Sequence, residues 1–121
     1  MNSIANSSSD DLFSNFPTNT SYIRLVGFGS LAFSAQLLVV NVNNGNTSHF
    51  EVKATFKSYP SYSLVGSPTI ITIDEDTPGA IVVKVTIDTG TGDIKLTVGN
   101  NSGNDVQCVC YVRYTETFFY I

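Results

Sequence analysis

The sequence contains few charged side chains, and most of those are negative. Charged residues make up 13% of the 121 residues, about half the share that is usual in a soluble domain. Six Lys and Arg residues stand against ten Asp and Glu residues, which gives a net charge of -4. Nucleic-acid binding needs a basic surface that displaces counterions. The composition therefore argues against nucleic acid as a partner.

Long apolar runs and a basic leader are also missing. No stretch has the length of about 20 apolar residues that a membrane-spanning helix needs. The first residues, M-N-S-I-A-N-S-S-S-D-D, have neither the basic region nor the apolar region of a signal peptide. We therefore expect a protein that is made in a cytoplasm and has no membrane partner.

The residue types that catalysis uses most often are scarce. The chain has one His and two Cys, and a Ser or Cys nucleophile needs a base within reach. Cys108 and Cys110 are two residues apart in V-Q-C-V-C-Y-V, so in a strand they share one face. We expect both to be reduced thiols that pack as small apolar groups. With no zinc-binding spacing, the sequence predicts no metal, no cofactor and no enzymatic activity.

The tripeptide Asp88-Thr89-Gly90 matches the motif that contains the catalytic carboxylate of aspartic proteases. Here Thr91 and Gly92 follow at once, and an alternating strand begins directly after them. Two alternating strands joined by a short Gly-containing loop are typical of an antiparallel hairpin. We interpret the motif as a hairpin turn in which Gly90 and Gly92 adopt positive φ. A protease dimer is retained as a minor hypothesis.

The acidic run D-E-D-T-P-G at 74–79 starts like a calcium-binding loop. Asp74 and Asp76 have the right spacing, but Pro78 and Val85 stand where further ligands should be. We interpret the run as a solvated turn, with a weak calcium contact left open.

Several segments alternate between apolar and polar residues with the period of a β-strand. The clearest are 50–57, 81–87 and 94–98, while residues 37–40 are apolar on both faces. A strand that is apolar on both faces is covered twice, so we expect a second sheet on one side and another subunit on the other. Turn residues separate the strands about every ten residues. The sequence predicts an all-β fold, an antiparallel, jelly-roll-like β-sandwich over residues 21–121; the competing architecture is a small closed barrel.

Residues 1–20 differ from the rest of the chain. Asn, Ser and Asp dominate them, and Pro17 breaks regular structure. We predict an extended N-terminal arm in which Leu12, Phe13 and Phe16 anchor the chain to a neighbouring subunit. The alternative is an arm that folds back on its own domain.

Two aromatic segments suggest contact surfaces. The last residues, Phe118, Phe119, Tyr120 and Ile121, are apolar on both strand faces, which predicts burial in an oligomer interface. Tyr59 and Tyr62 flank a proline in a loop, where tyrosines offer rigid faces for a glycan or a protein. Packing of both rings on their own domain is the alternative.

A resemblance to a known group of proteins rests on the general pattern of two segments, S-Y-I-R-L-V-G-F-G-S-L-A-F-S-A-Q and G-D-I-K-L-T-V-G-N-N-S-G-N-D-V-Q-C-V-C-Y-V-R-Y. The chain resembles small β-sandwich proteins of tailed-bacteriophage virions, both capsid cement or decoration proteins and the knobs of head or tail fibres. The resemblance implies a structural protein of the virion, assembled in the host cytoplasm. It also implies a homo-oligomer, most often a trimer, that binds the major capsid protein or another virion protein. The alternative is a fibre knob or adhesin that binds host surface glycans.

Overall fold

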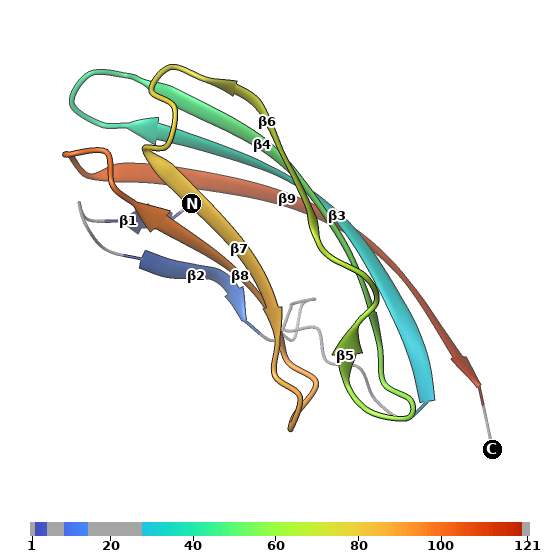
Figure 1. Ribbon diagram of the computed structural model, residues 1–121. Coiled ribbons are helices and arrows are strands. Elements are labelled where there is room, and N and C mark those ends of the chain that lie inside the picture. Colours follow the sequence, from blue (N-terminus) through green and yellow to red (C-terminus); the bar gives the residue numbers. More distant parts are fainter. Residues whose placement is uncertain (1, 5–8, 15–27, 120–121) are drawn as a thin grey trace.

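A computed structural model describes residues 2–4, 9–14 and 28–119 (Figure 1). For residues 2, 3, 9–14, 28, 118 and 119 it describes the backbone alone. In these ranges the chain forms nine strands in two antiparallel sheets that pack against each other. The predicted all-β antiparallel sandwich is confirmed.

The larger sheet contains six of the described strands, and we call it the large sheet. Its order is β1-β9-β3-β4, and β5 and β6 follow one another along the far edge of β4. The strands are β1 (Asn2–Ile4), β3 (Phe28–Asn41), β4 (Thr47–Lys57), β5 (Ser63–Leu64), β6 (Thr69–Glu75) and β9 (Val106–Phe119). The long strands β3, β4 and β9 curve together across the molecule (Figure 1).

The second sheet has three described strands, in the order β2-β8-β7, and we call it the small sheet. Its strands are β2 (Ser9–Ser14), β7 (Ile81–Ile87) and β8 (Ile94–Asn100). It lies against the inner face of the large sheet (Figure 1).

Alternating side chains of both sheets build the core between them. On β4, the four residues that the sequence pattern placed inward are all buried, as are the corresponding residues of β8. The rings of Phe33 and Phe56 stack with their centroids 5.8 Å apart. Burial of each large apolar side chain contributes about 1.5–3 kcal/mol, so this contact layer supplies much of the stability. The buried apolar residues of the two strands are Phe50, Val52, Ala54, Phe56, Ile94, Leu96 and Val98.

The run at residues 37–40 behaves as the sequence indicated on its inner face. Leu37 and Val39 lie in the core, whereas Leu38 and Val40 point to the outer face of the large sheet and are exposed. The second cover that the sequence predicted for this outer face, another subunit, stays a prediction.

The two described parts of the N-terminal arm pair with strands of the same chain. β1 pairs with β9, and β2 pairs with β8. Ile4 is buried in the core, and the Asn100 side-chain amide donates hydrogen bonds to the carbonyls of Ile4 (3.0 Å) and Asn104 (2.9 Å). The predicted boundary between arm and domain, at residues 20 and 21, lies outside the described residues.

Within the described ranges, no helix is long and apolar enough to cross a membrane.

Replacement of Phe56 by Ala should remove about 3–5 kcal/mol from the free energy of unfolding, because a fully buried ring would leave a cavity beside Phe33. Urea unfolding followed by circular dichroism measures the change. The neighbouring, exposed Thr55 is the matched control, and Thr55→Ala should change the free energy by less than about 0.5 kcal/mol. Equal effects of the two substitutions would contradict the described core.

Candidate functional site

The Asp88 motif forms a tight hairpin turn between β7 and β8. The Asp88 amide donates to the Asp93 carbonyl, and the Gly92 amide donates to the Asp88 carbonyl, both at 2.8 Å. One Asp88 carboxylate oxygen accepts hydrogen bonds from the Gly90 and Thr91 amides, at 2.8 and 3.2 Å. The interpretation as a hairpin is confirmed. This carboxylate stabilises its own turn.

One detail of that interpretation is wrong. Gly92 has a positive φ of 81°, but Gly90 does not have a positive φ. The Asp88 carboxylate binds the Gly90 amide directly, so the chain reverses with one left-handed residue.

The acidic run at 74–79 also serves its own loop. The Glu75 carboxylate accepts from the Ser48 hydroxyl at 2.9 Å and from the Gly79 amide at 3.0 Å. The Asp76 carboxylate accepts from the Thr47 amide at 2.9 Å. These bonds fix the loop after β6 to the start of β4. In the described part of the chain, no three His, Cys, Asp or Glu residues are grouped so that they could hold a metal ion.

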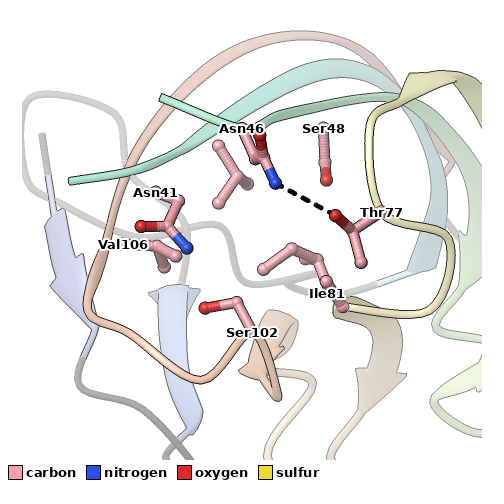
Figure 2. A pocket seen from close by; sticks show the side chains of 9 residues that line it. Asn41, Asn46, Ser48, Thr77, Ile81, Ser102 and Val106 are labelled. Atoms are coloured by element: carbon pink, nitrogen blue, oxygen red, sulfur yellow. Dashed lines mark hydrogen bonds between the residues drawn. The ribbon is translucent and has the colours of Figure 1, made fainter. Parts of the chain in front are cut away.

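A small polar cavity lies beside this loop, at one end of the sandwich (Figure 2). Its volume is about 30 Å³, which is room for one or two water molecules and far below the 300–1,000 Å³ or so of a small-molecule site. Across it, the Asn46 amide donates to the Thr77 hydroxyl at 3.1 Å. The cavity closes the end of the core and is too small for a sugar ring. It is lined by Val39, Asn41, Asn46, Ser48, Thr77, Ala80, Ile81, Ser102 and Val106.

The two cysteines are free thiols on the inner face of β9. Cys108 is buried and Cys110 is half-buried. Burial, with a smaller contribution from the neighbouring Cys108, raises the pKa of Cys110 to about 11. Because the thiolate is the nucleophile and the metal ligand, a protonated Cys110 favours a packing role.

The two loop tyrosines have different surroundings. Tyr59 is exposed, whereas Tyr62 is half-buried and packs against the core. The Tyr62 ring lies directly over Gly92, where an added Cβ would come within 2.7 Å of a ring carbon. The loop after β4 is therefore held against the hairpin of Asp88, and Tyr59 is the ring that faces solvent.

The predicted anchors are placed by the structure only in part. Leu12 and Phe13 belong to β2, where the backbone of Phe13 lies opposite Leu96, and their side chains are outside the described set. Phe16 is outside the described residues altogether.

The structure also describes the predicted C-terminal interface only in part. The backbones of Phe118 and Phe119 pair with Gly29 and Phe28 of β3. Tyr120 and Ile121 lie outside the described residues. The interface role of these four residues stays a prediction.

The largest exposed apolar feature of the β3–β9 pair lies on the outer face of the large sheet. We call Leu38, Val40, Val109 and Tyr111 the outer patch. Leu38 of β3 lies directly opposite Val109 of β9, and their side chains are 50% and 53% exposed. Tyr111 beside them is 62% exposed. A shallow groove of about 310 Å³ runs through the patch, between residues that include Gln36 and His49.

Sequence reasoning found half of the outer patch. The run at 37–40 indicated Leu38 and Val40, but Val109 and Tyr111 were not recognised. Their positions in the sequence could have shown them. They alternate with Cys108 and Cys110 on β9 and must therefore point to the opposite face. That they adjoin Leu38 follows from the β3–β9 register, which the sequence does not reveal.

No model of a protein family matches the chain, and no curated protein matches it.

Cys110 should react slowly in the folded protein. At pH 8, a pKa of about 11 leaves about one thiol in a thousand ionised. We expect Ellman's reagent to label the folded Cys108→Ala variant at least about a hundred times more slowly than the same variant in urea. Because the pKa is raised in the folded state, the associated stability is present below the unfolded pKa of about 8.5 and is lost as the pH rises through about 11. Equal labelling rates in the two states would contradict a buried Cys110.

Proposed function

We propose that the protein is a non-enzymatic structural component of a bacteriophage virion: a capsid cement or decoration protein that forms homo-oligomers and stabilises the shell. The observation that carries the proposal is the outer patch. It is a group of large apolar side chains exposed on the most firmly paired part of the fold.

The outer patch has the properties of the centre of a protein interface. Such centres are apolar, enriched in aromatic residues and depleted of charge. Leu38, Val109 and Tyr111 supply the apolar and aromatic surface. Charge lies at its border, where the Arg113 guanidinium is 6.0 Å from the centre of the Tyr111 ring and Glu51 lies opposite Gln36. Each of the larger side chains contributes about 1.5–3 kcal/mol when a partner buries it completely.

The support beneath the patch is rigid. β3 is paired with β4 on one side and with β9 on the other over almost its whole length. A patch on such a platform binds without first having to be ordered, and binding therefore loses little free energy to conformational entropy.

The carboxylates and thiols of the described residues support a mechanical role. Asp88 and Glu75 accept hydrogen bonds from amides of their own loops, Asp76 accepts one from the Thr47 amide at the start of β4, and the pKa of Cys110 is raised. These groups are used to hold turns and to fill the core.

The N-terminal arm supplies the second contact in this proposal. Its anchors Leu12, Phe13 and Phe16 contact neighbouring capsid subunits, and the arms of one oligomer act together, which multiplies their effect on affinity. β2, which contains two of these anchors, is an edge strand of the small sheet.

Capsid binding should depend on the outer patch. We expect Val109→Lys to lower the affinity for shells of the encoding virus, assembled without the protein, by at least about tenfold, since a charge would be buried in the contact. Cosedimentation with such shells measures it. Thr55→Lys, on the same face of β4 but away from the patch, should bind normally.

The arm is tested with the same shells. A chain in which Leu12, Phe13 and Phe16 are replaced by Ala keeps β1 and the buried Ile4, and it should fold and bind more weakly. Normal binding by both this chain and Val109→Lys would refute the proposal, as would absence of the protein from purified virions by mass spectrometry.

A fibre knob that binds host glycans is the second candidate, and the exposure of Tyr59 favours it. Under this hypothesis Tyr59→Ala abolishes binding on a glycan array while the variant keeps the circular dichroism spectrum of the parent. Tyr62→Ala is the less informative variant, since it removes a ring that packs on Gly92. An array without any bound glycan for the parent protein would contradict the knob hypothesis.

A further inference from the structure

β6 is an edge strand of the large sheet. One side of it pairs with β4, and within the described ranges no strand pairs with its other side. A sheet edge presents unpaired backbone amides and carbonyls, and proteins usually protect it with Lys, Pro or a covering segment. Residues 69–73 of β6, T-I-I-T-I, contain neither a charge nor a proline.

The side chains of β6 are exposed on both faces of the sheet. Ile71, opposite Glu51, is 43% exposed, and Ile70, opposite Val52, is 39% exposed. Ile70 lies on the inner face of the sheet, so the small sheet does not cover the large sheet as far as β6. Ile73 is also 43% exposed. Three β-branched apolar residues within four positions of an edge strand are typical of a strand that pairs with another chain.

We propose that β6 pairs antiparallel with β6 of a second copy of this chain, so that the two large sheets become one continuous sheet. The inference stands on a different observation from the proposed function. The edge lies beyond β4, whereas the outer patch is carried by β3 and β9. A dimer made in this way leaves the outer patch free for another partner.

Charge selects the antiparallel direction. Asp74 and Glu75 occupy one end of β6, and the uncharged Pro68 and Thr69 occupy the other. Parallel pairing in register would place the two acidic ends side by side, and like charges opposite each other destabilise a sheet. In the antiparallel direction each acidic end meets the uncharged end of the other copy.

The side chains of the segment complement one another in the same direction. With the two-fold axis at Ile71, this residue faces its own copy, Ile70 faces Thr72, and Thr69 faces Ile73. Every pair then consists of β-branched residues, which pack well across strands. The register shift between His49 and Phe50 leaves Ile73 as the extra residue relative to β4, so the regular part of the edge is centred near Ile71.

The test is the mass of the full chain in solution, measured by size exclusion with light scattering over a dilution series. We expect a mass of twice 13.1 kDa that falls toward 13.1 kDa on dilution. Ile71→Lys adds a charge of the kind that natural edges carry, and should give a folded monomer, with the parent circular dichroism spectrum, at every concentration. Val109→Lys is the matched control and should form the dimer as the parent does.

Amide hydrogen exchange gives a second readout on the same samples. Those amides of residues 69–73 that point away from β4 should be protected in the concentrated parent protein and should lose protection on dilution or in Ile71→Lys, whereas the amides bonded to β4 should stay protected. A parent that is monomeric at all concentrations overturns the inference. An oligomer that survives Ile71→Lys also overturns it, including a trimer, because pairing about a two-fold axis closes at two copies. Unchanged protection in a monomeric variant overturns it too, since another segment would then cover the edge.

Capsid binding separates the inference from the proposed function. Ile71→Lys should lose the dimer and still bind the shell through the contact of each single chain, more weakly than the parent because two arms no longer act together. Val109→Lys should lose the patch contact while it keeps the dimer. Failure of one result leaves the other standing.

Discussion

The unequal width of the two sheets is the constraint on which the rest of this structure depends. A sandwich buries its core only where both sheets are present, and here three described strands face six. Above the small sheet, alternate residues of β3 and β4 are fully buried, as Leu37 and Val52 show. Beyond it, the same inner face is open at Ile70. The difference in width between the two sheets therefore has two results. The core is dense where both sheets are present, and the inner face is exposed along the edge at β6, where only the large sheet is present.

The alternation of apolar and polar residues along the strands predicted much of the fold. It failed where a strand lacks a buried face. β4, β7 and β8 alternate because one face of each meets the core, so their inward residues could be read directly. The two faces of β6 do not differ in this way, since the neighbours Ile70 and Ile71 are 39% and 43% exposed. A strand that is exposed on both faces has no alternation of apolar and polar residues to detect. The same limit applies to pairing. Which strand lies beside β3 depends on the return of β9 from the far end of the chain, and local pattern carries no information about such long-range contacts.

The candidate site shows this division within a single face. Leu38 and Val40 were predictable, since an apolar residue between Leu37 and Val39 has to point away from the core. Val109 joins them only through the register that sets it opposite Leu38. The Asp88 turn shows the converse: its hairpin followed from local pattern, but the positive φ expected at Gly90 does not occur, and the Gly90 amide donates to the Asp88 carboxylate. Side-chain hydrogen bonds of this kind depend on local geometry, which the amino-acid sequence alone does not reveal.

The N-terminal strands connect the arm to the same mismatch. β1 and β2 extend the large and the small sheet, respectively, and Asn100 joins them to the core through the Ile4 carbonyl. Withdrawal of β1 would expose Ile4 and leave a buried amide donor of Asn100 without one acceptor, and an unmade buried hydrogen bond costs about 1–3 kcal/mol. An arm that reaches a neighbouring subunit therefore does so at lowest cost while residues 2–4 stay paired. If Leu12 and Phe13 act as anchors, as the proposed function requires, they do so from β2, an edge strand of the small sheet. Attachment and folding then use the same strands and do not compete for them.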